Sequence, residues 1–291
     1  MNNISNYDRS YLAGLVDGDG SIFIRRARSS IREQFLPVLS IASKHRHFLQ
    51  CIQNLIGGGN IISERWDKSG ETVVRYIYYL TFTCTSAKGV INLIYKYLLI
   101  SNARASVALD FPKVSRRGFR WYGNKMIQSK EFYQAKNKQK LLYHEMRDTP
   151  HFFAMQEMNT NEIFAYSAGF FDAEGHVSIC HLNNRLESVI VGFTNKNLEI
   201  LEFIKETFGI RNKLQKDAND VFRLICTGNA AKDVLRNIKP FLRLKKDRAE
   251  LAILFPLQEN KGCKLSEELI NERHIISNKM ALLNGRAKAM D

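Results

Sequence analysis

The sequence predicts an α+β fold built from two tandem copies of one unit, and three observations support this prediction. A ten-residue motif that begins at Tyr11 returns at Tyr166, an offset of 155 residues. Later matches keep the same order, while the offset shrinks to 152 and then to 144. The length of 291 residues suits about two domains. Because ordered self-similarity indicates a repeated architecture, each copy is expected to run helix, strand, strand, helix, strand, strand, helix.

The first copy has the periodicities that this order requires. Apolar residues alternate with polar ones in the expected strands and recur at helical spacing in the expected helices. Gly57 ends the second helix and Pro112 stops the last one. The expected elements are helices at 6–18, 44–56, 86–98 and 102–110, and strands at 21–28, 34–43, 60–66 and 72–83.

The second copy repeats the pattern, and two segments have no counterpart in the repeat. A basic connector holds ten basic and two acidic residues between Lys113 and Arg147, and a helical extension is expected at 264–284. We therefore predict an N-terminal domain at 1–112, a connector at 113–160 and a C-terminal domain at 161–291. The expected elements of the second copy are helices at 161–173, 196–208, 230–239 and 245–255, and strands at 176–182, 187–194, 210–217 and 221–227.

The composition indicates what kind of partner the protein binds and in which compartment it works. The net charge is +14, from 43 basic and 29 acidic residues, which suits a polyanion because neutralised phosphates release counterions. The five cysteines are scattered and form no C-x-x-C pair, so we expect reduced thiols in an intracellular protein. The most apolar stretch, 90–100, is too short to span a membrane. The abundance of Ile, Asn and Lys points to an organelle-encoded gene, in a mitochondrion or chloroplast.

Small residues in the motif predict a close helix pair. Ala13-Gly14 and Ala168-Gly169 give each motif helix a face without bulky side chains, which lets two helix backbones approach closely. We expect the two helices to pack against each other about a pseudo-two-fold axis, as the same helix of two identical subunits does in a symmetric dimer. The alternative is that each helix packs only on its own sheet.

The acids at the end of each motif predict a metal site. Asp19 and Glu174 each precede a glycine that would end the helix, so each lies where the helix dipole disfavours a carboxylate by about 0.3–1 kcal/mol. A divalent cation would offset this cost, and hard oxygen ligands suit Mg²⁺. Asp17 and Asp172 point elsewhere on the helix, and we interpret them as structural hydrogen-bonding groups, with an outer-shell catalytic role as the alternative.

The motif resembles that of a known family. Residues 12–20, Leu-Ala-Gly-Leu-Val-Asp-Gly-Asp-Gly, are similar to the signature of the LAGLIDADG homing endonucleases, and residues 167–175 resemble a diverged second copy. The resemblance covers the repeats at 5–112 and 160–256. It implies a monomer with two pseudo-symmetric domains, each with a saddle-shaped antiparallel sheet in the DNA major groove. It also implies a double-strand break in a long, asymmetric DNA target, as in intron homing.

The resemblance assigns the metal ligands. The last acid of each motif, here Asp19 and Glu174, is the family's ligand, and the backbone carbonyls of Gly18 and Ala173 complete the coordination. Mg²⁺ is the implied ion, and Mn²⁺ or Ca²⁺ would substitute for it in binding.

The resemblance also assigns supporting groups. A polar residue at the end of each second strand orders active-site water, which matches Ser43 and Asn195. A basic residue that opens the last helix of each copy supports catalysis. The second copy has Lys245 there, whereas the first has Ser101, which predicts two unequal active sites.

Strand alternation predicts the surface that reads DNA. Successive side chains of a strand point to opposite faces. If Ile22 and Ile24 face the core, Phe23 and Arg25 face the DNA. The alternative for any single position is a solvated surface residue that does not contact DNA. The expected DNA contacts are Phe23, Arg25, Gln34, Val38, Ser40, Arg65, Arg75, Cys180, Arg185, Lys213 and Arg223 in the two domains, with Arg116, Arg117 and Arg120 in the connector.

Two other functions compete with DNA cleavage. A maturase of the same family would bind intron RNA as a splicing cofactor, alone or beside cleavage, and it can keep both acids. A DNA-binding regulator built on a decayed endonuclease needs neither acid, so the retention of Asp19 and Glu174 disfavours it.

Overall fold

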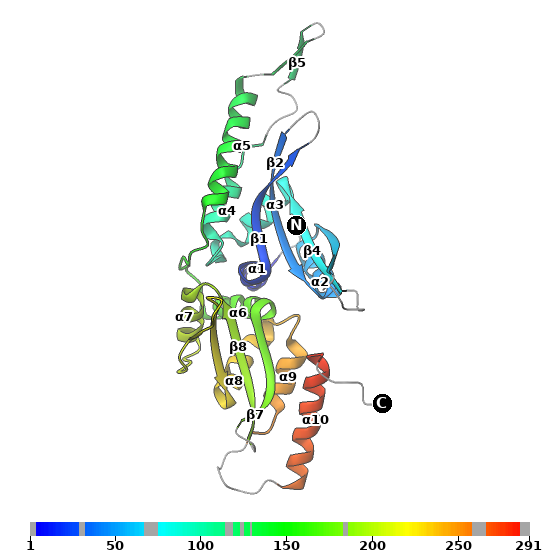
Figure 1. The fold of residues 1–291 in the computed structure, drawn as a ribbon, viewed down its shortest axis with the longest axis vertical. Helices are drawn as coiled ribbons and strands as arrows, with labels where there is room; N and C mark the ends of the chain where they lie inside the picture. Colours follow the sequence, from blue (N-terminus) through cyan, green and yellow to red (C-terminus); the bar gives the residue numbers. More distant parts are fainter. Residues whose placement is uncertain are drawn as a thin grey trace. The chain divides into compact units, whose positions relative to one another are not determined.

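The computed structural model describes residues 4–28, 33–66, 75–113, 119–122, 125–128, 130–182, 186–257 and 266–285. Contacts divide the chain into two compact units, Met1–Ile4 with Asp19–Glu157, and Ser5–Gly18 with Met158–Asp291. Each unit holds one four-stranded antiparallel sheet (Figure 1). The predicted α+β class with two repeated sheets is confirmed. The first motif helix, α1 (Asn6–Asp19), is grouped with the second repeat, whereas the predicted domain boundaries follow the repeat in the sequence.

The first sheet has the strand order β1-β2-β4-β3. Its strands are β1 (Gly20–Arg28), β2 (Glu33–Ser43), β3 (Asn60–Trp66) and β4 (Arg75–Thr83). Ile22 pairs with Leu39, and Leu39 with Phe82, and all three are buried. Helices α2 (Arg46–Ile56) and α3 (Cys84–Ile94) pack on β2 and β4. One face of the sheet therefore forms the core of the unit.

The remaining elements of the first unit follow in chain order. A short 3-10 turn, η1 (Tyr95–Tyr97), leads to α4 (Asn102–Leu109), which packs on α3 and β1. The connector contains the hairpin β5 (Phe119–Tyr122) and β6 (Lys125–Gln128), followed by α5 (Lys130–Asp148). Helix α5 packs on α4 and on the first two strands, and the aromatic ring of Phe35 contacts that of Tyr143. The connector is thus partly built into the first unit.

The second sheet repeats the topology as β7-β8-β10-β9. Its core residues come from alternate positions, such as Val177, Val191 and Phe193. Apart from the motif helix, α9 and α10 pack together and both contact β7, while α7 and α8 pack on β8 and β10. The elements are α6 (Thr160–Glu174), β7 (Gly175–Leu182), β8 (Leu186–Asn195), α7 (Leu198–Thr207), β9 (Gln215–Lys216), β10 (Phe222–Thr227), α8 (Gly228–Ile238), η3 (Lys239–Phe241), α9 (Lys246–Leu254) and α10 (Glu267–Leu283).

Strand β9 differs most from the sequence prediction, since it has two residues where 210–217 was expected. The Asp217 carboxylate accepts hydrogen bonds from the backbone N–H groups of Asn219 and Val221, and Asp220 adopts a φ of 59°. This turn joins β9 to β10. At the other end of the expected strand, the N–H of Ile210 donates to the carbonyl oxygen of Lys205 at 2.9 Å and so closes the end of α7. Within the described residues, none of the helices has the length and apolarity to cross a membrane.

Candidate active site at the ends of the motif helices

Helices α1 and α6 approach each other backbone to backbone in the second unit. A Cβ added to Gly14 would lie 2.0 Å from the carbonyl oxygen of Tyr166. A Cβ added to Gly169 would lie 1.9 Å from the carbonyl oxygen of Tyr11. Near the helix ends, a Cβ on Gly18 would lie 2.4 Å from that of Ala173. The close packing predicted from the small residues is confirmed, and no larger side chain fits at Gly14 or Gly169 without separating the helices.

Two reciprocal hydrogen bonds join the motif helices. The Tyr11 hydroxyl donates to the Asp172 carboxylate at 2.7 Å, and the Tyr166 hydroxyl donates to the Asp17 carboxylate at 2.8 Å. All four side chains are buried. Burial, and then the neighbouring carboxylate, raise the pKa of each tyrosine well above its ordinary value. These bonds confirm the structural role expected for the inner acids, and they repeat the pseudo-symmetry of the motif at atomic scale.

Asp172 also fixes the start of α9. Its carboxylate accepts hydrogen bonds from the backbone N–H groups of Arg243, Leu244 and Lys245, at 2.8, 3.0 and 2.9 Å. These donors lie immediately before α9, whose N-cap residue is Lys245. A buried carboxylate with one hydroxyl and three amide donors is well compensated for the loss of water. Asp172 thereby ties the beginning of α9 to the end of α6.

Lys245 caps the C-terminus of α6 and is 8% exposed. Its Nζ donates to the carbonyl oxygens of Phe171, Asp172 and Ala173, at 2.7, 2.7 and 3.3 Å. The Thr194 hydroxyl donates to the carbonyl oxygen of Glu174 at 3.2 Å. The last four carbonyls of α6 therefore all have donors, and an ammonium group lies at the negative end of the helix dipole. The cost expected for an acid at this end is partly offset by a protein cation.

The two terminal acids lie where the motif predicts them. Asp19 is the last residue of α1 and is exposed, and Glu174 is the last residue of α6 and is half-buried. Helix α6 ends at Glu174 with Gly175 as its C-cap, as expected, and Gly175 has an extended conformation with a φ of −80°. A Cβ on Gly175 would lie 2.0 Å from the ring of Phe171. This glycine is required for space, and its conformation is open to any residue.

Ser43 and Asn195 occupy matching places as the last residues of β2 and β8. The Ser43 hydroxyl accepts a hydrogen bond from the His45 N–H at 3.1 Å, and the Asn195 side-chain oxygen accepts one from the Asn197 N–H at 2.9 Å. Each side chain thus supports the turn into the next helix. Their expected role in ordering water remains a prediction.

The donor set at the helix ends fits a hard divalent cation. Each helix end offers one carboxylate and one carbonyl, from Asp19 and Gly18 in the first copy and from Glu174 and Ala173 in the second. All of these donors are oxygen atoms, which Mg²⁺ prefers. Across the described part of the chain, no three His, Cys, Asp or Glu side chains gather as a ready metal site. Mg²⁺ commonly keeps several waters and takes one or two carboxylates with substrate phosphates, so one acid at each site is compatible with this ion.

The outer face of the first sheet carries several of the expected DNA contacts. Arg25 and Gln34 are exposed, and Phe23 and Ser40 are half-buried. The expected exposure of Val38 was wrong: this side chain is 1% exposed, because it pairs with Phe23 and Thr83 in the centre of the sheet.

Of the two distal arginines of this sheet, Arg65 is exposed on β3 and pairs with Tyr76. Tyr76 has the parity of the core residues Leu80 and Phe82, so Arg65 lies on the face opposite to that of Arg25. Arg75 is the first residue of β4, and its side chain lies outside the described residues.

In the second sheet, the residues expected to contact DNA differ in their exposure and in their partners. Cys180 is half-buried on the outer face beside Ser188, and burial raises the pKa of its thiol. Arg223 is exposed and pairs with the Asp217 carboxylate at 3.0 Å. Lys213 is exposed in the segment before β9, and Arg185 lies outside the described residues.

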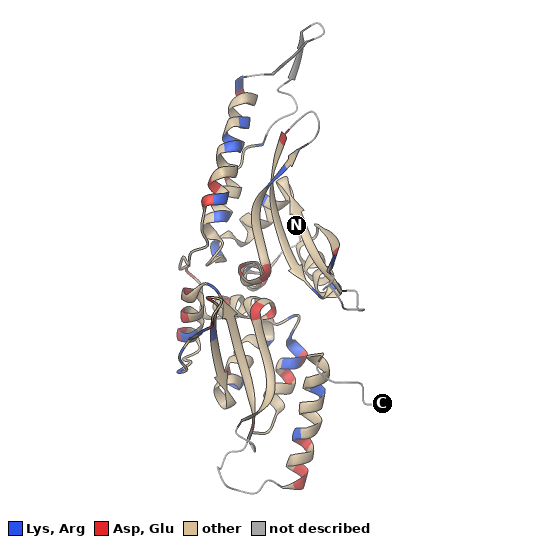
Figure 2. Cartoon of the chain, in the orientation of Figure 1, with Lys and Arg blue, Asp and Glu red and all other residues tan. Residues whose placement is uncertain are grey.

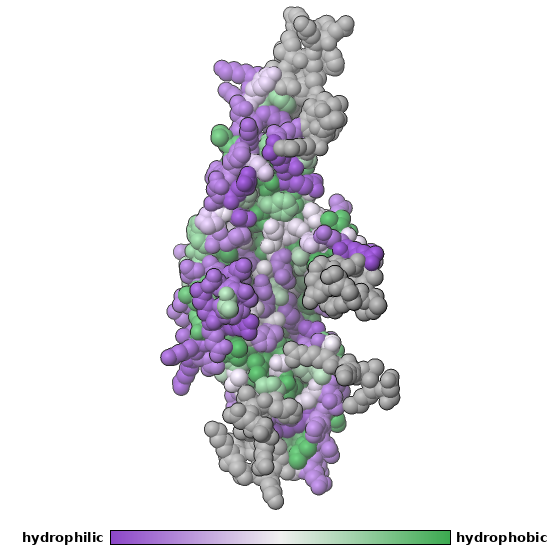
Figure 3. Space-filling view, viewed as in Figure 1, coloured by the Kyte–Doolittle hydropathy of each residue, from purple (hydrophilic) through white to green (hydrophobic). Residues whose placement is uncertain are grey.

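Helix α5 carries part of the positive charge of the connector. Five basic and three acidic residues lie on this helix, and its surface is hydrophilic in Figure 3, with the basic positions in blue in Figure 2. Arg116 and Arg117 lie outside the described residues, and Arg120 is in β5. The role of these three arginines in DNA binding stays a prediction.

The structure adds residues that the sequence reasoning did not assign. Tyr11 and Tyr166 are the first residues of the two motifs, and their recurrence in register is the sequence feature that could have indicated their role. Arg243 was not foreseen: its guanidinium lies over the Tyr11 ring, 5.0 Å from the centroid, and pairs with Asp8 at 2.5 Å. No local pattern marks this arginine, because its partners are far away in the sequence.

The fold and the site together define a protein with a duplicated α+β unit and a motif helix that ends in an acid in each copy. Two family models match in tandem, the LAGLIDADG endonuclease at residues 12–114 and the LAGLIDADG-like domain at residues 161–239, and together they span more than half of the chain. The chain belongs to the LAGLIDADG homing endonuclease family, a class of DNA-cleaving enzymes.

Solved structures agree with this assignment at the level of the fold. The homing endonuclease I-GzeII, in complex with its DNA target, is 14% identical with a TM-score of 0.66, and the match covers 98% of this chain and 100% of that chain. I-LtrWI, bound to target DNA, is 14% identical with a TM-score of 0.64, covering 96% and 98%. I-SmaMI, bound to uncleaved DNA in the presence of calcium ions, is 14% identical with a TM-score of 0.55, covering 94% and 98%. No curated protein matches the chain significantly.

Proposed function

We propose that this protein is a site-specific DNA endonuclease that makes a double-strand break in a long, asymmetric target and acts in intron homing. Membership of the family supports the reaction class. The observation that carries the proposal is the placement of Asp19 and Glu174 as the last residues of two motif helices whose backbones are in contact. Similar proteins were solved with DNA targets, which supports double-stranded DNA as the substrate.

Each terminal acid would hold one divalent cation, with Mg²⁺ as the ion that the oxygen donors favour. Bound there, the cation would supply charge neutralisation at the scissile phosphate and a water of lowered pKa. The protein's own part is to keep each carboxylate in place. On the second side, Lys245 holds the last carbonyls of α6, and Asp172 holds the start of α9.

The outer faces of the two sheets would read the target sequence. Arg25 and Gln34 are exposed there, and these side-chain types suit guanine and adenine edges in the major groove. The net charge of +14 would add affinity that does not depend on sequence.

The decisive experiment separates cleavage from binding. A target is first selected from a randomised duplex library by binding to the protein, and it is then placed in a plasmid. Asp19→Asn and Glu174→Gln should each abolish double-strand cleavage in Mg²⁺, while the affinity for the target stays within about tenfold, because the metal site is distinct from the reading surface.

The matched control is Glu206→Gln, an exposed acid on α7, which should cleave like the parent. Cleavage by Asp19→Asn or Glu174→Gln at the parent rate would refute the assignment of these acids.

A further inference from the structure

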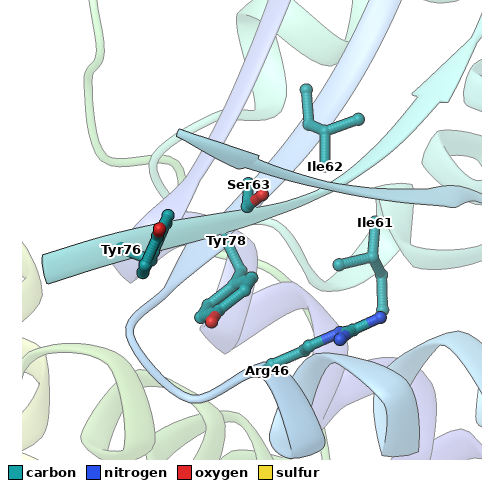
Figure 4. A pocket seen from close by; sticks show the side chains of 6 residues that line it. All are labelled: Arg46, Ile61, Ile62, Ser63, Tyr76 and Tyr78. Carbon is teal, nitrogen blue, oxygen red and sulfur yellow. The ribbon is translucent and has the colours of Figure 1, made fainter. Parts of the chain in front are cut away.

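A small cavity lies beside the N-terminus of α2, away from the surface proposed to read DNA. Its volume is about 280 Å³, and it is lined by Arg46, Ile61, Ile62, Ser63, Tyr76 and Tyr78 (Figure 4). Tyr76 and Tyr78 have the same parity on β4 as Leu80 and Phe82, which face the core under α2 and α3. The tyrosines, Ile61 and Ser63 are therefore on the helix-bearing side of the sheet, whereas Arg25 and Ser40 lie on the other side. Ile62, at the edge strand, has the opposite parity and points away from them in Figure 4.

The lining combines aromatic rings with one cation. The ring centroids of Tyr76 and Tyr78 are 6.4 Å apart and tilted by 32°, and Tyr76 is 47% exposed. Arg46 is exposed at the first position of α2, and its side chain runs toward Ile61 in Figure 4. None of the six lining residues is acidic. Stacking surface beside a guanidinium is the combination that binds unpaired bases and their phosphates.

The surroundings of Arg46 are unusually basic. Lys44, His45 and His47 flank it, and all are exposed. The first turn of α2 has no acidic residue, and the His45 side chain does not cap the helix. Cations near the N-terminus of a helix oppose its dipole, so an anion there would remove an unfavourable interaction.

The second repeat provides an internal comparison. At the matching helix α7, the Asn197 side chain accepts a hydrogen bond from the Ile200 N–H at 3.0 Å, and Glu199 lies in the first turn. The position that matches Tyr78, opposite the last residue of the second strand, is Phe222. Both units thus have an aromatic ring at this position, and Lys216 lies over the ring of Phe222. The units differ at the start of the helix, where α7 has the ordinary capping chemistry and α2 has a run of basic residues.

We propose that this cavity binds one unpaired nucleotide of a single-stranded nucleic acid. The base stacks on Tyr76 and Tyr78, and its phosphate pairs with Arg46 at the start of α2. A base within a duplex offers only its edges to a protein, because its faces are covered by neighbouring bases, so the rings select an unpaired strand. The cavity is slightly smaller than the pockets of about 300–1,000 Å³ that hold drug-sized ligands, which suits a single nucleotide.

The test measures the binding of fluorescein-labelled eight-nucleotide oligouridylate and oligothymidylate by anisotropy, with the full chain and without divalent metal. Tyr76→Ala should weaken single-strand binding by about tenfold, and Arg46→Ala by a similar factor, as expected for a lost stacked base or phosphate contact. Tyr76→Phe keeps the ring and should bind like the parent. Affinity for the duplex target should change by less than threefold in all three variants, about 0.7 kcal/mol at most.

Matched controls come from outside the cavity: Tyr133 on α5 is 57% exposed, and Lys279 on α10 is exposed and lies outside the basic connector. Tyr133→Ala and Lys279→Ala remove the same kinds of group and should leave single-strand affinity near that of the parent. Tighter binding of oligouridylate than of oligothymidylate would identify RNA as the ligand, and the reverse would identify DNA.

Three results would overturn the proposal: a parent protein that does not bind either oligonucleotide, a loss with Tyr76→Ala no larger than with Tyr133→Ala, or an equal loss with Tyr76→Phe. None of these results depends on cleavage, so the proposed endonuclease function is tested separately.

Discussion

The buried tyrosine–aspartate pairs are the most informative contacts at the scale of single residues. Tyr11 donates to Asp172 and Tyr166 donates to Asp17, so each motif supplies one donor and one acceptor. A buried carboxylate that loses a donor keeps its desolvation cost, which is about 1–3 kcal/mol per unsatisfied group. These four side chains therefore specify how the two motif helices meet.

Alkaline pH should weaken the fold through these tyrosines. Burial raises the pKa of Tyr11 and of Tyr166 in the folded protein, while the unfolded chain keeps a value of about 10. The stabilising contribution is therefore fully present below about pH 10 and is lost as the pH rises through the folded pKa. Denaturant unfolding at pH 8 to 11 should show a smaller alkaline loss of stability in Tyr11→Phe than in the parent.

The same measurement supplies its own control. Tyr133→Phe alters an exposed tyrosine of α5 and should leave the alkaline slope unchanged. If Tyr11→Phe keeps the full slope of the parent, the Tyr11 hydroxyl does not stay protonated in the folded state.

Lys245 is the residue that should make the two cleavage sites differ in rate. Its Nζ donates to three carbonyls at the end of α6, whereas Ser101 occupies the corresponding position of the first repeat and is buried. If the ammonium assists its own site, nicked plasmid should accumulate before linear product in the parent. Lys245→Met should slow the faster nick and reduce this accumulation, which strand-specific end-labelling of the target would measure.

The neighbouring Lys246 is exposed, so Lys246→Met is the matched control and should preserve both rates. Two strands cut at the same rate in the parent, and slowed equally by Lys245→Met, would contradict the idea of unequal sites.

Close helix packing decides the architecture at the scale of elements. The carbonyl oxygens of Tyr11 and Tyr166 occupy the space that side chains at Gly169 and Gly14 would need. Backbone atoms cannot rotate away as a side chain can, so overpacking here must be relieved by a shift of a whole helix. The glycines of the motif are therefore a requirement of packing.

Gly14→Ala should destabilise the protein by about 3 kcal/mol, at the upper end of the usual cost of overpacking. Chemical denaturation would measure the change. Gly58→Ala is the control, because a Cβ there meets nothing within 4 Å, and the free energy of unfolding should stay the same or rise slightly. Equal stabilities for the two variants would mean that α1 and α6 separate at little cost.

At the scale of the whole molecule, the net positive charge determines how strongly the protein is attracted to nucleic acid. The chain carries a net charge of +14, and the connector between Lys113 and Arg147 holds ten basic and two acidic residues. Phosphate contacts made by such a segment add affinity without sequence preference and make binding depend on salt.

Removing positive charge from the connector should therefore lower the affinity for every DNA duplex by a similar factor. Replacing Arg116, Arg117 and Arg120 by glutamine should weaken binding to target and non-target DNA similarly and flatten the salt slope by up to about three units, close to one per phosphate contact. Affinities measured at several salt concentrations give this slope. An unchanged slope would show that the connector arginines are only solvated surface.

The sequence by itself determined the duplicated fold and the position of its acids. Offsets between repeated residues identify copies of one unit, and hydrophobic periodicity places most helices and strands, because both are local properties of the chain. The motif also marks Asp19 and Glu174, since a carboxylate at a helix C-terminus conflicts with the dipole. The start of the β9 strand was misjudged, because the N–H of Ile210 closes the end of α7 by donating to the Lys205 carbonyl oxygen.

Only the tertiary structure decided what lies opposite each side chain. The bonds from Lys245 to α6 and from Asp172 to α9 join residues more than 70 positions apart, and no periodicity encodes such a distance. Val38 has the parity of an outer-face residue, yet it is buried by its neighbours in the sheet. Gly175 is a glycine because the Phe171 ring fills the space of its Cβ. Burial and long-range hydrogen bonds depend on how elements pack, and the sequence pattern of one element does not contain that information.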